Sequence, residues 1–354
     1  MRDSRMKVIS CTGYFSSGSS ALTDLVAEYN PVFDLSNFEF RFLHDLDGIS
    51  DLEFQLVECH NRHNSGHAIK RYQKLARFYE GNRFSRKYSA YFKKGDFRRI
   101  TDKYIDSLID FKFPGWWFYD LYDRGTKIYY LYQIANHLYH KTGIPLFRIM
   151  KNELTYCSHP DEETFLKLTR DYVTDVLNAL NSDNKEYIEV NQIVPSSNIE
   201  RILRYFNEQI FVFVVDRDPR DIFLLEKYYL KHGIAPTDPE LFCKWFRYNR
   251  EAGHGIPDDD PRIIKLQFED IVYNYDDVVS RLEQVTGLKP EHHTAKFIKM
   301  NPKRSVCNTQ VWKRGDDPEA VKIIEKLLPE YLYDFESVKD HPIVGIDINS
   351  DMPF

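Results

Sequence analysis

The stretch that most constrains this chain lies near its start, where an apolar, β-branched run gives way to a glycine loop. The run contains Val8 and Ile9, and two glycines with several small hydroxyl residues follow it. Helical spacing then begins, with one apolar face made by Leu22, Leu25, Val26 and Tyr29. Glycines allow sharp turns and close approach of the backbone to a ligand, and the first N–H groups of a helix point at anions. The stretch therefore predicts a strand–loop–helix cradle for an anion.

The spacing of this loop matches a known phosphate-binding pattern in part. Gly13 and Gly18 stand where the P-loop G-x-x-x-x-G-K-[ST] has its glycines, and Ser20 stands at the hydroxyl position. The lysine position holds Ser19, which argues against ATP hydrolysis because nucleoside triphosphatases use that lysine on the phosphates. Two interpretations follow: an anion-binding loop, or a Gly/Ser turn with an ordinary helix N-cap from Ser19 or Ser20.

Composition narrows the class of protein. The 354 residues suffice for one large α/β domain or one domain with insertions, and the net charge of −6 argues against bulk binding of nucleic acid or membrane surfaces. Five scattered cysteines without a C-x-x-C pair favour reduced thiols over disulfides or zinc. The first residues leave no room for a signal peptide, and the apolar run 210–215 is only strand-sized. We therefore expect a soluble, cytoplasmic protein without a transmembrane segment.

A second strand is predicted after the first helix, from Val32 through residue 43. Its alternation puts Glu39 and Arg41 on one side and Phe40 and Phe42 on the other, and His44 begins the turn that follows. Charged residues at a strand end close to a phosphate loop are well placed for a site.

Residues 51–185 form a mainly helical region by pattern. Within it, 70–99 is strongly basic and rich in aromatic residues, which suits either an anionic glycan or nucleic acid, or a solvated helical face. His60, His63 and His67 have helix-like spacing, but surface histidines are the simpler interpretation because no carboxylate or cysteine stands in register. The aromatic run 113–119 is interpreted as a packed corner, with a stacking platform as the alternative.

An α/β rhythm returns from about residue 185. Strands are predicted over 185–190, 210–215 and 262–267, and the second of these is apolar on both faces, as expected inside a parallel sheet. A charged turn, 216–221, follows that strand, with Pro219 suited to a first helical turn. Later come a helix ending at Gly287, a Lys/Arg/Trp segment over 301–315, another helix, and an irregular tail from about 330 to 354.

Taken in order, these pieces resemble the sulfotransferases that use 3′-phosphoadenosine 5′-phosphosulfate (PAPS). The resemblance covers about the first 45 residues and 185–315. The loop resembles the family's 5′-phosphosulfate loop, residues 215–221 resemble its 3′-phosphate-binding turn, and 265–270 is similar to its R-Y-E-D-L segment. The residues that the resemblance assigns to PAPS are Gly13, Tyr14, Phe15, Ser16, Ser17, Gly18, Ser19, Ser20, Arg217, Trp312, Lys313 and Arg314.

The resemblance also implies roles for single side chains. Arg217 would pair with the 3′-phosphate, with a salt-bridged helix start as the alternative. Trp312 would stack on adenine, or belong to the core. The glycan-modifying branch has a glutamate base in a short E-V-H-F-F-like strand, which falls on Glu39; His44 is the second choice, and a solvent-facing glutamate is the plain alternative.

Two positions depart from the family pattern. The family has Lys or Arg where this chain has Ser16, and a serine where it has Leu225. These departures bear on catalysis more than on nucleotide binding. Arg41, Lys313 or Arg314 is expected to supply the missing cation.

The sequence thus predicts an α/β, P-loop-type three-layer fold: a central parallel sheet, flanking helices and a large helical insertion. It predicts sulfuryl transfer from PAPS, without a metal, to a hydroxyl of a carbohydrate or glycolipid, and no nucleic-acid partner. The alternatives are a non-catalytic nucleotide-binding homologue, a nucleotide or sugar kinase, and RNA binding through residues 70–99.

Overall fold

The computed structural model describes residues 6–36, 38–81, 87–252, 256–257 and 259–341. The chain divides into two compact units, the first made of Met1–Arg41 and Asp183–Phe354 and the second of Phe42–Ser182. Each unit is described by itself. That the second unit is an insertion into one sulfotransferase-like domain stays a prediction.

The first unit is built on a five-stranded parallel sheet in the order β2-β5-β1-β6-β7. These strands are β1 (Lys7–Gly13), β2 (Val32–Asp34), β5 (Tyr187–Glu189), β6 (Gln209–Asp216) and β7 (Ile263–Gln267). The helices of this unit are α1 (Ser19–Val26), α8 (Ile199–Leu203), α9 (Pro219–Leu224), α10 (Pro239–Glu251), α11 (Phe268–Tyr273), α12 (Tyr275–Thr286), α13 (Pro302–Ser305) and α14 (Pro318–Leu327). The predicted α/β class with a central parallel sheet is confirmed.

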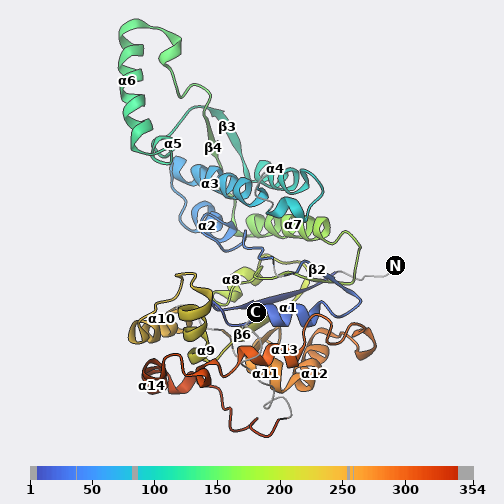
Figure 1. Cartoon of the computed structure of the whole chain (residues 1–354). Coiled ribbons are helices and arrows are strands. Elements are labelled where there is room, and N and C mark those ends of the chain that lie inside the picture. Colours follow the sequence, from blue (N-terminus) through green and yellow to red (C-terminus); the bar gives the residue numbers. More distant parts are fainter. Residues whose placement is uncertain (1–5, 37, 82–86, 253–255, 258, 342–354) are drawn as a thin grey trace, which may run out of the picture. The chain divides into compact units, whose positions relative to one another are not determined.

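Helices cover both faces of the sheet. Ile9 and Cys11 of β1 join a core with α1, α11 and α12, while Val8 and Ser10, which point the other way, are fully buried as well. Figure 1 shows α8 on one side of the strands and α1, α11 and α12 on the other. Because both faces are covered, the inner strand β6 is an almost continuous apolar run, as predicted.

The second predicted strand is only partly present. β2 ends at Asp34, and Glu39–Leu43 forms no strand. The alternation in this segment is nevertheless real, because Phe40 and Phe42 are fully buried whereas Glu39 is exposed. The segment is fixed by single contacts such as the 2.9 Å hydrogen bond from the Phe40 N–H to the Asn191 carbonyl, so burial alone produced the strand-like pattern.

The described residues of the second unit form six helices and a small antiparallel sheet that the sequence did not predict. Its helices are α2 (Ile49–Glu53), α3 (Arg62–Glu80), α4 (Asp96–Leu108), α5 (Phe118–Tyr122), α6 (Thr126–Thr142) and α7 (Glu162–Leu180), and its strands are β3 (Phe111–Pro114) and β4 (Leu154–Cys157). The aromatic run 113–119 is less packed than predicted, since Phe113, Trp116 and Phe118 are exposed.

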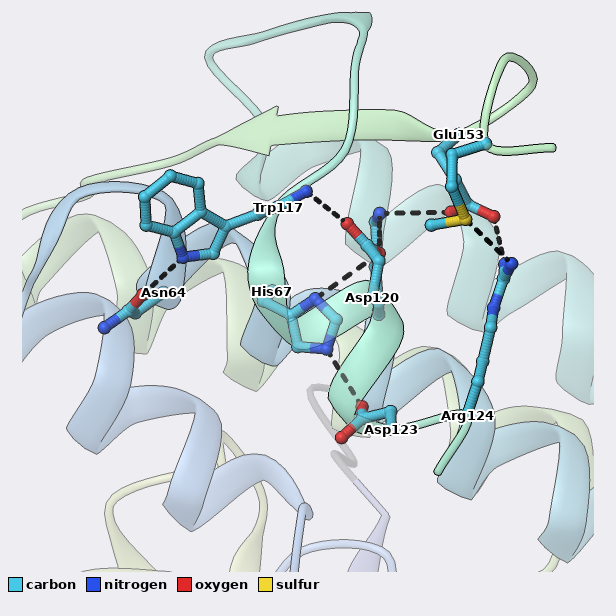
Figure 2. A network of polar contacts seen from close by, with 9 residues as sticks. Asn64, His67, Trp117, Asp120, Asp123, Arg124 and Glu153 are labelled. Carbon is cyan, nitrogen blue, oxygen red and sulfur yellow. Dashed lines mark hydrogen bonds and ion pairs between the residues drawn. The ribbon is translucent and has the colours of Figure 1, made fainter. Parts of the chain in front are cut away.

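His67 differs from its prediction as a surface histidine. It is buried, its Nε2 lies 2.9 Å from Asp123 Oδ2, and its Nδ1 lies 3.6 Å from Asp120 Oδ1 (Figure 2). Both carboxylates come from α5 and the residue just after it, more than fifty positions away. Sequence spacing around the histidine could not reveal such partners.

Shorter helical turns complete the chain. Of the turns in the described ranges, η1 (Phe54–Glu58) and η4 (Leu225–Leu230) are π-helical. The 3₁₀ turns are η2 (Tyr88–Ala90), η3 (Pro145–Phe147), η5 (Pro290–His292), η6 (Val306–Asn308), η7 (Val311–Arg314) and η8 (Pro329–Tyr331). The predicted irregular tail from 330 is described as far as 341. No helix within the described ranges is long and apolar enough to cross a membrane.

Candidate functional site

The loop Gly13–Ser20 connects β1 to α1, as predicted. Its backbone is left-handed at Ser16 (φ 58°) and at Gly18 (φ 86°), and the Ser17 N–H donates a 3.1 Å hydrogen bond to the Tyr14 carbonyl. The loop therefore turns within five residues and delivers the chain directly to the first turn of α1.

Close packing explains the two glycines. A Cβ on Gly13 would lie 2.2 Å from Ser17 Oγ and 2.6 Å from the Val215 carbonyl oxygen. A Cβ on Gly18 would lie 2.5 Å from the Phe268 ring, and the positive φ adds strain. Both glycines are thus required to seat the loop against β6 and α11, whatever ligand the loop binds.

The start of α1 has the character of an anion site. Gly18 is the N-cap and supplies no side-chain cap, so the interpretation as an ordinary cap from Ser19 or Ser20 is wrong. The first turn carries no acidic residue. The Ala21 N–H donates to the Gly18 carbonyl over 3.0 Å, whereas the N–H groups of Ser19 and Ser20 come before the first intrahelical acceptor. The Ser17 hydroxyl is buried without a hydrogen-bond partner among the described residues. The positive end of the helix is therefore available to an anion.

Arg217 follows β6 and joins the loop to a distant segment. Its Nη1 donates to the Ser16 carbonyl over 3.3 Å, its Nη2 donates to the Asn308 carbonyl, and its guanidinium lies 4.7 Å from the Phe268 ring centre. The side chain is buried, and burial lowers the pKa of Arg217 against the opposing effect of nearby carboxylates. Its Nε has no partner in the described part of the chain, which leaves one N–H for a ligand.

Three buried acidic residues lie around Arg217. Glu269 accepts the Asp218 N–H over 3.0 Å, and Asp221 accepts the N–H groups of Gln310 and Val311 over 2.8 and 2.7 Å. Burial raises the pKa of Glu269 well above its usual value, and burial together with Asp218 raises the pKa of Asp221 to about 7. The cluster therefore ties the 216–221 turn to α11 and to the late segment.

Arg220 has a structural role next to Trp312. Its Nη2 pairs with Asp218 Oδ2 over 2.7 Å and its Nη1 with Glu325 Oε1 over 2.8 Å. Its guanidinium lies 4.3 Å from the Trp312 ring centre, and the ring packs beside the core of α9, α10 and α14. Arg220 thus forms the salt-bridged helix start that was one interpretation of this turn, and it covers part of Trp312.

The two cations after Trp312 differ in setting. Lys313 is exposed, with its Nζ 5.4 Å from the Trp312 ring centre. Arg314 is half-buried. It donates a 3.0 Å hydrogen bond to the Cys307 carbonyl and a 3.4 Å hydrogen bond to the Tyr229 hydroxyl. Lys313 is therefore the more accessible of the two for an anionic ligand.

A polar cavity of about 400 Å³ adjoins the loop through Tyr14. Arg250 lines it and pairs with Asp216 through its Nε over 2.8 Å, and its guanidinium lies 4.1 Å from the Tyr14 ring centre. Burial and the Asp216 charge raise the pKa of Tyr14. Phe15 packs edge-on to Trp245 instead, with ring centres 6.2 Å apart. Arg250 could not be recognised from the sequence, because an arginine within an amphipathic helix has no local pattern that marks it as part of a site.

Glu39 lies in the first unit, on the segment that follows β2. Its Oε2 is 3.4 Å from Arg41 Nη1, and both side chains are substantially exposed. His44 belongs to the second unit, where its Nδ1 lies 3.8 Å from Asp45 Oδ1. Leu225, where the resemblance predicts a serine, is fully buried at the start of η4 and offers no polar group to a ligand.

The basic stretch 70–99 carries several ion pairs. Lys70 pairs with Asp120 over 2.5 Å, Arg71 with Asp47 over 2.9 Å, and Arg98 with Glu80 over 2.5 Å. Arg83 and Arg86 lie outside the described residues. Within the described ranges no group of three His, Cys, Asp or Glu side chains could hold a metal ion.

Comparison with known proteins adds little to this description. No protein-family model matches the sequence, and no curated protein matches it. Among solved structures, the chain is similar to retinol dehydratase in complex with androsterone and the inactive cofactor PAP, at 13% identity and a TM-score of 0.35. The likeness covers 93% of this chain and 81% of that chain. At this TM-score it assigns neither fold nor function, so both rest on the chain's own residues.

Proposed function

We propose that this protein transfers a sulfuryl group from PAPS to a hydroxyl group of a carbohydrate or glycolipid acceptor. The observation that carries the proposal is the start of α1: an uncapped helix end without acidic residues, beside a buried arginine with one N–H to spare. This arrangement suits phosphate oxygens, since backbone N–H groups, the helix dipole and a guanidinium all favour negative charge.

The topology of the sheet supports one site at its carboxyl edge. The loop leaves the end of β1, Arg217 leaves the end of β6, and β1 and β6 are neighbours paired from Lys7↔Gln209 to Gly13↔Val215. On the other side of β1 lies β5, and two residues past the end of β5 the Asn191 carbonyl accepts the Phe40 N–H. Glu39 is therefore carried to the same edge as the loop, where ligands of open α/β sheets bind.

The residues present fit the nucleotide. The Ser17 hydroxyl and Arg217 Nε are buried polar atoms without partners in the described part of the chain, and such atoms are costly unless a ligand satisfies them. We expect the loop N–H groups to hold the 5′ end of PAPS, Arg217 and Lys313 to hold the 3′-phosphate, and Trp312 to contact adenine. When bound, PAPS supplies the sulfuryl group and departs as 3′-phosphoadenosine 5′-phosphate (PAP).

Glu39 is proposed as the general base. Its carboxylate would take the proton of the acceptor hydroxyl, and Arg41, whose Nη1 lies 3.4 Å away, would stabilise developing negative charge in place of the cation that Ser16 lacks. The carbohydrate or glycolipid acceptor is proposed on the resemblance of residues 39–43 to the glycan-modifying branch and on the basic, aromatic stretch 70–99.

Calorimetric titration with PAP tests the donor. We expect PAP to bind without magnesium and more tightly than ATP, with or without magnesium. Arg217→Ala should weaken PAP binding. The control is Arg262→Ala, which removes an arginine that pairs with Asp260 and has no part in the proposed site, and it should leave PAP binding unchanged. Circular dichroism checks that both variants fold. Absence of PAP binding, or a preference for magnesium-ATP, contradicts the proposal.

One observation favours a second candidate, a nucleotide-binding protein without transferase activity. Ser16 and the buried Leu225 remove two polar contacts that the family uses, and both changes bear on catalysis more than on binding. Tight binding of PAP without sulfate transfer from PAPS to any of a panel of hydroxyl acceptors would favour this candidate.

A further inference from the structure

The second unit contains a helix that has almost no buried side chain. α6 is seventeen residues long, and Ala135 is its one buried residue. Its inner side packs through Tyr132 against Trp116, with ring centres 4.8 Å apart. Figure 1 shows α6 and the connection to η3 at one end of this unit. A helix of this length normally buries an apolar stripe, so its open face requires an explanation.

The open face of α6 is apolar and has lysine at both ends. Tyr130, Leu131 and Ile134 are 63%, 52% and 61% exposed. Helical spacing of three and four residues puts Lys127 and Lys141 on the same face, in the first and last turns. Both lysines are exposed, and neither has an ion pair within the ranges that the structure describes. The face therefore combines apolar side chains with unneutralised positive charge.

The chain around this helix contains no acidic residue. From Arg124 to Asn152 there are five lysines and arginines, two histidines and neither aspartate nor glutamate, in a protein whose net charge is −6. The same stretch exposes Ile144, Leu146 and Ile149. The basic apolar surface, defined as Lys127, Tyr130, Leu131, Ile134, Lys141 and Leu146, thus lies in a stretch of the chain that is positively charged and has no acidic side chain.

The base of this surface is firmly held. Asp120 of α5 accepts the Trp117 N–H over 2.7 Å and pairs with Lys70 of α3 over 2.5 Å, and Asp123 contacts His67 over 2.9 Å (Figure 2). Arg124 pairs with Glu153 beside β4. The residues that lead into α6 are therefore anchored on α3 and β4, while the outer face of α6 is open.

We propose that the basic apolar surface binds the face of an anionic lipid bilayer. Lysines attract anionic headgroups, and Tyr, Leu and Ile enter the boundary between headgroups and acyl chains, the composition typical of interfacial helices. Lysine stems also pack along apolar surface while their charges stay in water. The inference does not depend on the proposed sulfuryl transfer, since it uses other residues and another ligand.

Self-association through the same face is disfavoured. In a two-fold dimer the surface would meet itself, and its lysines would face lysines with no acidic residue in the stretch to pair with them. An anionic lipid surface carries the opposite charge, so this repulsion does not arise there.

Vesicle co-sedimentation tests the proposal. The full-length protein is mixed with vesicles of phosphatidylcholine alone or with about a quarter phosphatidylglycerol, at low and high salt. We expect binding to the anionic vesicles only, weakened by salt. Lys127→Gln with Lys141→Gln should reduce the affinity roughly 30-fold, at about 1 kcal/mol for each lysine. Leu131→Ser with Ile134→Ser should reduce it at least about tenfold.

Matched controls separate the surface from general effects. Lys322→Gln with Lys326→Gln removes two exposed lysines from α14, and Leu241→Ser with Ile298→Ser removes two exposed apolar side chains of the first unit. Both control pairs should bind vesicles like the unchanged protein. The proposal is overturned if anionic vesicles are not bound, or if the α6 variants bind as well as the controls. The proposal is also overturned if the protein does not bind vesicles but forms a dimer in sedimentation analysis, and the α6 variants are monomeric. The partner of this surface would then be a second copy of the chain.

Discussion

The packing of Gly18 against Phe268 gives the sharpest test of the loop's geometry. An alanine at Gly18 meets two costs: a left-handed backbone, worth about 1–2 kcal/mol, and a Cβ 2.5 Å from a buried ring, where overpacking costs about 1–3 kcal/mol. Gly233 has a similar backbone (φ 72°) in the same unit, and a Cβ there would meet nothing within 4 Å. Gly18→Ala should therefore cost about 2–5 kcal/mol, and Gly233→Ala about 1–2 kcal/mol.

A double-mutant cycle isolates the steric part. Phe268→Ala removes the ring atoms that an alanine at Gly18 would meet, so the two changes together should cost less than the sum of the single costs, by about 1–3 kcal/mol. The measurement is urea unfolding followed by tryptophan fluorescence, with PAP titration in parallel. Equal costs for Gly18→Ala and Gly233→Ala, or a coupling energy below about 0.5 kcal/mol, would refute the claim that Phe268 dictates this glycine.

Three further predictions concern chemistry and titration. Glu39→Gln should lower the rate of sulfate transfer about 10²–10⁴-fold at unchanged PAP affinity, and Arg41→Ala should also lower it. The exposed Glu291→Gln is the control and should leave the rate unchanged. Unchanged rates in the first two variants would remove Glu39 and Arg41 from catalysis. The raised pKa of Glu269 means that the folded state keeps a proton that the unfolded chain loses above about pH 4.5, so stability falls as pH rises. Urea unfolding across pH should therefore show the native protein losing up to about 1.4 kcal/mol per pH unit relative to Glu269→Gln, and parallel curves would disprove this. A thiol reagent should modify the exposed Cys59 first and the buried Cys11 and Cys243 slowly, since burial raises the pKa of both buried thiols, to about 11 for Cys243; fast labelling of Cys11 would contradict its burial.

The elements that were predicted correctly have local signatures. β1 and β6 are apolar runs, Pro219 opens α9, and Gly287 ends α12 with the left-handed backbone (φ 77°) that glycine favours. Each of these signals arises within a few neighbouring residues. The chain's preference for strand, turn or helix is set there by side-chain sterics and backbone freedom, which the sequence records directly.

The wrong predictions share one physical cause. Residues 39–43 alternate because Phe40 and Phe42 are buried, yet the backbone pairs at single points and makes no ladder. His67 seemed a surface residue because its carboxylate partners come from another part of the chain. In both cases the setting depends on segments far apart in the sequence. Local patterns therefore indicated a strand for residues 39–43 and a surface position for His67.

The strand–loop–helix start of the first unit, its strands β5, β6 and β7, and the missing loop lysine at Ser19 could be predicted from the sequence, because these features depend on neighbours in the chain. Tertiary structure alone decided how the candidate site is held. Arg217 contacts the Ser16 carbonyl 201 positions away, and Glu269 accepts the Asp218 N–H 51 positions away. Such contacts shift the pKa of buried carboxyl groups and fix which polar atoms remain for a ligand, since desolvation and distance exist only once the chain has folded.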